Sequence, residues 1–223
     1  MKITELTKRS LMFTVPENAD GFVNMNLILG ENYNYIIDTG MGESNVNEML
    51  KYINDSKPII AIITHAHFDH ILGNSALKDS LIISHRLCWE IIDKGWDTKI
   101  KSDLVKHSAY IDSKVYKHLP NLLFESRMHF PEDGITLFHT PGHSDDGISI
   151  YDAVDKALYV GDNFGVFDGV AYLWADDPLD AKQYIEQYKQ YDFDICVPSH
   201  SAPQSREVIG LLEKALEKEL KSE

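Results

Sequence analysis

Apolar residues in the first third of the chain form short strand-like runs around one helix-like segment. The runs Phe22 to Leu29 and Tyr33 to Ile37 flank the turn residues Gly30-Glu31-Asn32, and this pattern predicts two strands joined by a turn. Glu43 to Asn54 has apolar residues at three- and four-residue spacing, which predicts a helix. Ile59 to Ile63 is a continuous apolar run rich in β-branched residues, as in a strand buried on both faces.

Strands followed by a helix occur again in the second half of the chain. Further strands are expected at Ile135 to His139, Ile148 to Tyr151, Ala157 to Val160 and Ile195 to Pro198. Further helices are expected at Pro178 to Gln190, with Asp177 as N-cap, and at Gln204 to Leu220. This repeated order predicts an α/β (α+β) fold in which two sheets pack face to face with helices outside.

The stretch from His85 to Phe130 interrupts this order and is longer than a plain connection needs. Its mixture of polar and aromatic residues is largely helical in pattern, so we interpret it as a helical insertion around residues 85–130, close to the functional site. The alternative is a peripheral pair of helices with no role in chemistry. With no linker or repeat in the sequence, residues 1–223 are expected to form a single domain.

The charge balance bears on the kind of partner. The formal net charge is −14, from 21 Lys and Arg against 35 Asp and Glu. A nucleic-acid-binding surface needs clustered Lys and Arg, so we expect a small-molecule substrate and no nucleic-acid partner. The sequence does not indicate the oligomeric state.

The cysteines and the apolar runs bear on the compartment. Cys88 and Cys196 lie far apart and form no Cys-x-x-Cys pair, which is typical of two reduced thiols in a cytosolic protein. The apolar stretch Leu11-Met12-Phe13 is too short for the core of a signal peptide, and no run approaches the roughly 20 apolar residues of a membrane span. We therefore expect a cytoplasmic location and no membrane partner.

Candidate metal ligands are concentrated directly after the Ile59 to Ile63 strand. His65, His67, Asp69 and His70 lie within one run of six residues. Two histidines two positions apart on an extended loop can turn both imidazoles toward one ion, and Asp69 and His70 can turn toward a neighbouring ion. This set of imidazole and carboxylate donors suits zinc, iron or manganese. The alternative is a polar loop that is rich in histidine by chance.

The run Thr64-His65-Ala66-His67-Phe68-Asp69-His70 resembles the defining motif of the metallo-β-lactamase superfamily, and further elements follow in the order of that family. They are Ile36-Ile37-Asp38-Thr39-Gly40, Thr140-Pro141-Gly142-His143-Ser144, Tyr159-Val160-Gly161-Asp162 and Pro198-Ser199-His200. The resemblance covers the chain from about residue 20 onward and implies a four-layer αββα sandwich. Carried over residue by residue, the resemblance implies two divalent metal ions. Zinc is the expected metal, with iron or manganese as alternatives.

The resemblance also implies how the ligands are shared. One metal would be held by His65, His67 and His143. The second would be held by Asp69, His70 and His200, and Asp162 would bridge both. Asp38 would orient the metal-binding loop, the alternative being a carboxylate that only forms a turn at a strand end.

Two metals that share a water lower its pKa toward about 7, so a bridging hydroxide would attack an ester, thioester or lactone carbonyl. Asp69 and Asp162 are the expected catalytic carboxylates, Asp69 as a proton relay and Asp162 as the bridge. The carboxylate at Asp162, together with His70, is similar to the glyoxalase II and acyl-homoserine-lactonase branches of the family. The alternatives are an iron-dependent redox enzyme, flavodiiron-like or dioxygenase-like, with the same ligands, or a phosphodiesterase.

Other residues are assigned by position. His139 lies inside a predicted strand, so we expect a structural role. Surface or pocket-lining roles are expected for His85, His107, His118 and His129. Aromatic residues after Asp162 are candidates to line an apolar substrate cleft, with ordinary core packing as the alternative; they are Phe164, Phe167, Tyr172 and Trp174.

Overall fold

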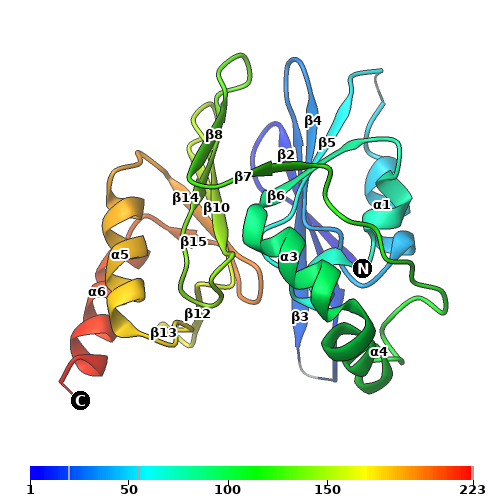
Figure 1. The fold of residues 1–223 in the computed structure, drawn as a ribbon. Coiled ribbons are helices and arrows are strands. Elements are labelled where there is room, and N and C mark those ends of the chain that lie inside the picture. The colour runs from blue at the N-terminus through cyan, green and yellow to red at the C-terminus, as the bar shows by residue number, and fades with distance from the viewer. Residues whose placement is uncertain (20, 55, 222–223) are drawn as a thin grey trace. The chain divides into compact units, whose positions relative to one another are not determined.

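The computed structural model describes residues 1–19, 21–54 and 56–221. The chain divides into two compact units, Met1–Glu125 and Ser126–Glu223, which run from blue to green and from green to red in Figure 1. Each unit contains one large sheet with helices packed against it.

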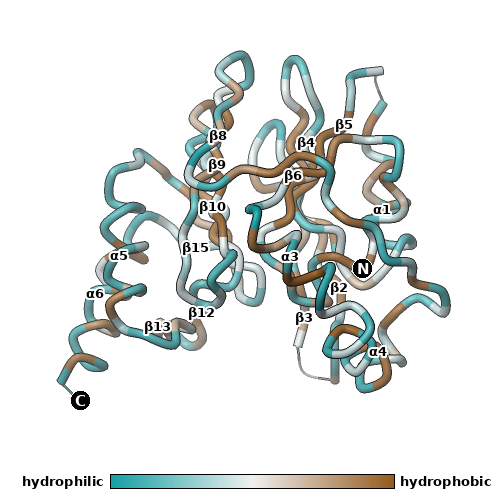
Figure 2. The backbone as a smooth tube through the Cα atoms, viewed as in Figure 1, coloured by the Kyte–Doolittle hydropathy of each residue, from teal (hydrophilic) through white to brown (hydrophobic). Residues whose placement is uncertain are grey.

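The first unit is built on a seven-stranded sheet in the order β1-β2-β3-β4-β5-β6-β7. Strands β1 to β4 pair antiparallel, and β4 to β7 pair parallel. The strands are β1 (Lys2–Glu5), β2 (Ser10–Pro16), β3 (Phe22–Leu29), β4 (Asn34–Ile37), β5 (Ile59–Ile62), β6 (Leu81–His85) and β7 (Leu122–Phe124). In Figure 2 the strands around β4 to β6 are mostly hydrophobic, as expected for central strands.

Helices of the first unit cover one face of this sheet. The apolar side chains Val46 and Met49 of α1 and Cys88 and Ile92 of α3 join a buried cluster with alternate residues of β3, such as Met25. The helices are α1 (Glu43–Leu50), α2 (Phe68–Ile71), α3 (Arg86–Gly95) and α4 (Lys101–Lys106), with a 3₁₀ turn at Asn74–Leu77 and a π-helical turn at Trp96–Ile100.

The second unit has a six-stranded sheet in the order β15-β14-β11-β10-β9-β8 and a separate hairpin, β12-β13. Among the strand pairs described in the large sheet, β11 and β14 are parallel and the other pairs are antiparallel. The strands are β8 (Arg127–Phe130), β9 (Ile135–His139), β10 (Ile148–Asp152), β11 (Ala157–Gly161), β12 (Phe164–Phe167), β13 (Val170–Leu173), β14 (Ile195–Pro198) and β15 (Gln204–Ser205).

Helices α5 (Pro178–Lys189) and α6 (Val208–Glu219) pack side by side against the second sheet (Figure 1). Their buried residues join those of β9, β11 and β14 in one apolar cluster. Asp177 is the N-cap of α5, as predicted, because its Oδ1 accepts from the Leu179 N–H at 2.8 Å. Pro178 follows at the first helical position, where a missing N–H costs nothing.

Two of the expected helices have different bounds in the structure. The α-helix expected over Glu43 to Asn54 ends at Leu50, and the chain continues in tighter turns in which Lys51 N–H bonds Glu48 O. The helix expected from Gln204 begins at Val208, because Gln204 and Ser205 form an edge strand with β14. The residues before Val208 carry no apolar periodicity, so the predicted helix start was placed too early.

The stretch around 85–130 is helical only in its first part. Residues Arg86 to Lys106 are helical, whereas Leu122–Phe124 completes the first sheet and Arg127–Phe130 is the edge strand of the second. These strands have three and four residues, which is too short for a hydrophobic pattern to indicate. The boundary between the two compact units therefore falls inside the segment that the sequence indicated as one insertion.

Among the described residues, no helix combines the length and the apolar character needed to cross a membrane.

Candidate metal centre

In the first unit, the candidate ligands follow the carboxyl ends of two parallel strands. Asp38 comes directly after β4, and Thr64 and His65 come shortly after β5. Because the carboxyl ends of parallel neighbours meet at one edge of a sheet, these side chains lie close together. The run that begins at His65 then passes into α2, a single turn of helix over Phe68–Ile71.

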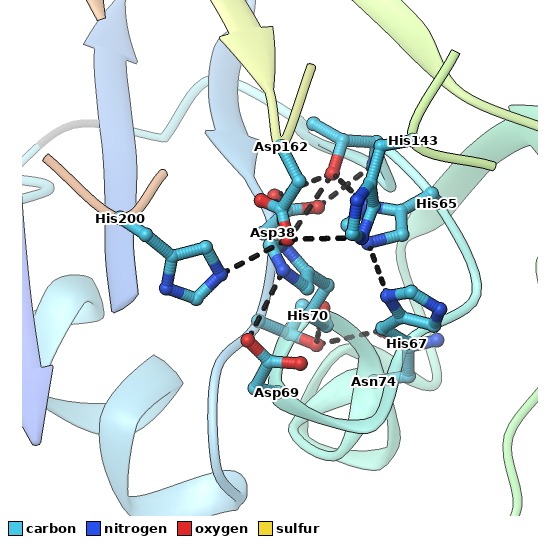
Figure 3. Close-up of polar contacts among 11 residues, drawn as sticks. Asp38, His65, His67, Asp69, His70, Asn74, His143, Asp162 and His200 are labelled. Atoms are coloured by element: carbon cyan, nitrogen blue, oxygen red, sulfur yellow. Dashed lines mark hydrogen bonds and ion pairs between the residues drawn. The ribbon is translucent and has the colours of Figure 1, made fainter. Parts of the chain in front are cut away.

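Asp38 holds the metal-binding loop through both of its carboxylate oxygens. Its Oδ1 accepts from the Thr64 N–H at 2.8 Å, and its Oδ2 accepts from Thr64 Oγ1 at 2.8 Å. The same Oδ2 lies 2.8 Å from His70 Nδ1 (Figure 3). Asp38 itself has a φ of 60°, a region that Asp and Asn tolerate better than most residues. A turn between β4 and α1 thereby fixes two points of the loop.

The neighbouring residues add a second attachment between the same segments. The Thr39 backbone N–H donates to the carbonyl of His70 at 2.8 Å. The Thr39 hydroxyl lies 3.0 Å from the same carbonyl and 2.8 Å from Asn74 Oδ1, and it can donate to either. Gly73 comes so close that a Cβ there would lie 2.3 Å from the carbonyl oxygen of Thr39. Only glycine allows this approach, so the Asp-Thr-Gly turn and the start of the 3₁₀ turn pack backbone to backbone.

The proton positions on two histidines follow from these contacts. Thr64 Oγ1 donates its hydrogen to Asp38, so it accepts from His65 Nδ1, which lies 3.1 Å away. His70 Nδ1 donates to the Asp38 carboxylate. In the neutral form of each ring the proton is therefore on Nδ1, and Nε2 carries the lone pair that a metal needs.

These Nε2 atoms lie beside further candidate ligand atoms of the first unit. His65 Nε2 lies 2.9 Å from His67 Nδ1, and His70 Nε2 lies 3.2 Å from Asp69 Oδ2. The ligand atoms of each pair lie within 4.8 Å of each other, close enough to share a metal ion. The first unit therefore presents two pairs of donors, His65 with His67 and Asp69 with His70.

In the second unit, three further candidate ligands also follow the ends of strands and lie close together. Asp162 follows β11, and His200 follows β14, its parallel neighbour. His143 follows β9, which runs in the same direction as β11 with β10 between them. Asp162 Oδ2 lies 3.0 Å from His200 Nε2 and 3.6 Å from His143 Nε2 (Figure 3). The carboxylate thus lies within reach of both imidazoles.

Asn163 positions this group of residues, and the sequence did not indicate it. Its Nδ2 donates to the carbonyl of Thr140 at 3.1 Å and to the Tyr188 hydroxyl at 2.8 Å. Its Oδ1 accepts from the His143 N–H at 3.4 Å, and its carbonyl accepts from Tyr184 Oη at 3.0 Å. Asn163 therefore ties the loop of His143 to the strand end of Asp162. Its place directly after Asp162 is the one signal that could have indicated it.

The tyrosines in this network act as neutral hydrogen-bonding groups. Burial raises the pKa of Tyr184 and Tyr188 well above the ordinary value, so both hydroxyls keep their protons. Tyr188 Oη also lies 3.0 Å from Ser149 Oγ, which itself lies 2.8 Å from Thr140 Oγ1. A buried polar chain thus runs from α5 through the sheet to the loop that carries His143.

Removing the Tyr188 hydroxyl should destabilise the second unit. In Tyr188→Phe, the buried side chains of Asn163 and Ser149 each lose a hydrogen-bond partner. We therefore expect the free energy of unfolding to fall by about 1–3 kcal/mol. Urea unfolding followed by circular dichroism measures this change. Tyr151→Phe is the matched control, because the Tyr151 hydroxyl donates to the Asp192 carbonyl in an exposed setting where water can replace it. An equal loss in both variants would contradict the role of the buried network.

The aromatic residues after Asp162 separate into two groups. Phe164 is fully buried in the apolar cluster of the second unit, so its expected place in a substrate cleft is wrong. Phe167 and Tyr172 are exposed on the other face of the β12-β13 hairpin. The Trp174 ring lies 6.3 Å from that of His143 and 5.9 Å from that of His200, measured between centroids. Trp174 thus covers two candidate ligands, as expected for a wall of the site.

The donor sets fit metal ions. Asp69 and Asp162 are 5% and 6% exposed, and burying a carboxylate costs free energy unless a cation or hydrogen bonds compensate it. The atoms beside these carboxylates belong to imidazoles, and in a neutral His70 ring the nitrogen that faces Asp69 is the one that carries the lone pair. Imidazole with carboxylate is a donor set that zinc, iron and manganese accept, so a divalent metal ion could be held by these atoms.

The other histidines lie elsewhere. His139 Nε2 lies 2.7 Å from the Asp145 carbonyl, so this ring ties down the loop between β9 and β10, in agreement with the expected structural role. His85 caps α3 by accepting from the Leu87 N–H. Among the described residues, the groups that could hold a metal ion contain none of the five remaining histidines, His85, His107, His118, His129 and His139.

The contacts of Asp38 make its contribution to metal binding testable. Asp38→Asn keeps the size and tolerates the same backbone conformation, but it weakens the bond to His70 Nδ1. We expect the affinity of the first unit's ligands for metal to fall by about 10–100-fold. Competition with a chromophoric chelator measures this affinity. Asp112→Asn is the control, because the Asp112 carboxylate accepts from the Ser44 N–H at 2.7 Å at the start of α1. An equal fall in metal affinity in this variant would contradict the proposed role of Asp38.

Comparison with known proteins identifies the family. Residues 18–200 match the sequence model of the metallo-beta-lactamase superfamily, and the chain therefore belongs to that superfamily. The human acyl-coenzyme A thioesterase MBLAC2 is 26% identical over 173 residues, which cover 68% of this chain and 61% of the relative. The Gallus gallus protein of the same name is 22% identical over 178 residues, covering 68% and 60%. The chain spans about three fifths of the length of these curated relatives.

Solved structures show the same fold. TMB-1 superimposes with a TM-score of 0.76 at 18% identity and covers 97% of both chains. The metallo-β-lactamase FIM-1 from Pseudomonas aeruginosa, solved in a mono-zinc form, has a TM-score of 0.71 at 16% identity, with 97% of this chain and 95% of that chain covered. The predicted mixed α/β metallo-β-lactamase fold is therefore confirmed.

Proposed function

We propose that the chain is a dinuclear metal-dependent hydrolase of thioesters, esters or lactones. Its first metal ion would be held by His65, His67 and His143, and its second by Asp69, His70 and His200, with Asp162 bridging both. Zinc is the proposed ion, with iron and manganese as the alternatives that the same donors accept. The observation that carries the proposal is the position of Asp162 within reach of two imidazoles of the second unit. The first unit contributes an intact His-x-His-x-Asp-His run.

The number of donors supports a centre that draws on both units. The first unit offers two ligand atoms for each proposed ion, and catalytic zinc sites use three protein ligands. His143, His200 and Asp162 of the second unit would complete both sets. The family match over residues 18–200 includes parts of both units, which supports one functional domain over 1–223, although residues 20, 55 and 222–223 lie outside the described residues.

When bound, the metal pair would activate a water molecule and polarise the carbonyl of the substrate. The chain's own residues supply the rest of the chemistry. Asp69 has a carboxylate oxygen 3.2 Å from His70 Nε2 and is slightly exposed, so it can accept the proton that leaves the attacking water and pass it to the leaving group. The Asp162 carboxylate lies within reach of His143 and His200 and would help to hold both rings in place. Trp174 limits the access of bulk water to these two histidines.

The proposed substrate class is an acyl thioester, with acyl-coenzyme A as its first representative. Two observations support it: the printed activity of the relatives is acyl-coenzyme A thioesterase, and the carboxylate at Asp162 is similar to that of thioester- and lactone-cleaving branches of the family. The likeness to β-lactamase structures is a likeness of fold, because their identity to this chain is below 20%.

A substrate panel tests this proposal. Metal-loaded protein and the same protein stripped by a chelator are assayed with an acyl thioester, an aryl ester, a homoserine lactone, a phosphodiester and a β-lactam. We expect thioester hydrolysis that disappears on stripping and returns with added metal. A fully metal-loaded protein that cleaves only the phosphodiester, or none of the five compounds, would contradict the proposal.

We also propose a cytoplasmic location. Cys88 and Cys196 are free and buried, as in proteins of a reducing compartment. Burial raises the pKa of the Cys196 thiol, so it stays protonated and unreactive. Cells that contain the labelled protein can be fractionated, and the fraction that carries the label tests the location directly.

A further inference from the structure

A groove of about 490 Å³ lies between the β12-β13 hairpin and α6, wholly within the second unit. One wall is formed by β13 and includes Val170 and Tyr172, which are both 51% exposed. The other wall is formed by α6, which packs against β13 (Figure 1), and it includes Leu211 and Ala215. The volume is that of a site for a small molecule.

Two lysines stand at the rim of this groove. Lys214 and Lys218 are four residues apart, so they project from the same side of α6. In the described part of the chain neither side chain has an ion-pair or hydrogen-bond partner, whereas Lys189 pairs with Glu213 at 3.0 Å. Glu219 adds one negative charge to the lining, which leaves the groove net positive. Two unpaired cations beside an apolar surface, in a chain of net charge −14, fit a ligand with an anionic head and a less polar arm.

An apolar path leads from the groove to the candidate ligands of the second unit. Tyr172 lines the groove, and its ring lies 6.0 Å from that of Phe167. Phe167 lies 6.3 Å from Trp174, whose ring neighbours those of His143 and His200. Residues 170 to 174 are extended or nearly so, and a strand rises about 3.3 Å per residue, so this path is about 13 Å long.

We infer that this groove binds the leaving-group arm of the substrate, and that Lys214 and Lys218 bind phosphate groups at the far end of that arm. This inference rests on the proposed function. The scissile thioester would lie beside His143, His200 and Asp162, and the uncharged arm would follow Tyr172 and Phe167. A thioester whose thiol carries a long arm ending in phosphates, as in coenzyme A, has this combination of groups. The two lysines then determine specificity without contacting the reacting atoms.

Binding of an unreactive probe tests the groove separately from hydrolysis. S-methyl coenzyme A has a capped thiol and cannot turn over, and S-methyl pantetheine has the same arm without phosphates. Isothermal titration calorimetry with metal-loaded protein should show tighter binding of the phosphorylated probe. We expect Lys214→Ala and Lys218→Ala each to weaken its binding about tenfold, the effect of one charged hydrogen bond, and to leave the pantetheine probe unchanged.

Lys182→Ala is the matched control, because Lys182 is an exposed lysine on α5 that does not line the groove. In turnover assays the two groove variants should raise KM for an acyl-coenzyme A about tenfold and keep kcat, with no change for the acyl-pantetheine. Equal binding of both probes, or equal effects of Lys182→Ala and Lys214→Ala, would overturn the groove assignment. Phosphate-dependent binding by a protein that cleaves no thioester would support the groove and contradict the proposed hydrolase function.

Discussion

Replacing Asp162 with Asn is expected to remove one metal ion from the protein and to lower turnover by at least about a hundredfold, the range seen when a charge-stabilising group is lost. Asn keeps the size of the side chain but removes its negative charge. Its amide cannot donate one oxygen to each of two metals, so the pair of ions would be held less closely and their positive charges less balanced. Elemental analysis together with thioester hydrolysis measures both effects in one preparation.

Asp168→Asn is the control for this variant. Asp168 is six residues further along, in the turn of the β12-β13 hairpin, with a φ of 50° that Asn also tolerates. Asn at this position should change neither metal content nor rate, whereas Ala would add backbone strain to the comparison. If Asp162→Asn kept two metals at full affinity and full rate, Asp162 would not be a bridge. The thioesterase- and lactonase-like assignment would then lose its main support.

His67→Ala should abolish measurable hydrolysis, with a fall of at least about a hundredfold, because it removes a direct ligand of the first proposed ion. The Nδ1 atom of His67 lies 2.9 Å from His65 Nε2, so its loss leaves that nitrogen without its neighbour in the first unit. Metal content should fall toward one ion per chain. Rates with a thioester at saturating substrate, measured beside elemental analysis, separate loss of metal from loss of substrate binding.

His139→Ala is the comparison for this change. It removes a ring contact with the Asp145 carbonyl and no proposed ligand, so hydrolysis should largely survive in a folded protein. Circular dichroism and urea unfolding establish that both variants are folded. Loss of activity and of metal to the same extent in His139→Ala would mean that His139 also holds a metal, or that the loop it supports is required for His143 to bind one.

The sequence predicted strands most accurately where apolar runs are bounded by turn residues. Phe22–Leu29, Ile135–His139 and Ile195–Pro198 agree with the structure at both ends, because each run is followed by a residue that starts a turn or a ligand loop. The site motifs were also readable, since ligands at strand ends need fixed residue types at short spacing. The family and the fold that these motifs implied are confirmed.

The parts that escaped prediction depend on contacts between distant residues. Strands β7 and β15 have three and two residues and exist because a neighbouring strand pairs with them. Asn163 looked like an ordinary polar residue, and its role depends on Thr140 and Tyr188, which lie 23 and 25 residues away. The groove beside Tyr172 likewise needs α6 to pack on β13, a contact that local periodicity does not encode.

The number of metal ions per chain tests the central claim most directly. The protein is purified without chelators, soaked in zinc and then freed of loosely bound metal. Inductively coupled plasma mass spectrometry gives the amount of zinc, and amino-acid analysis gives the amount of protein. Metal-stripped protein is also titrated with zinc, and the rate of acyl thioester hydrolysis is measured in the same samples. The proposed ligand sets predict close to two ions per chain and a rate that reaches its plateau at the second equivalent. At most one bound ion after soaking, with full activity at that occupancy, would contradict the dinuclear centre.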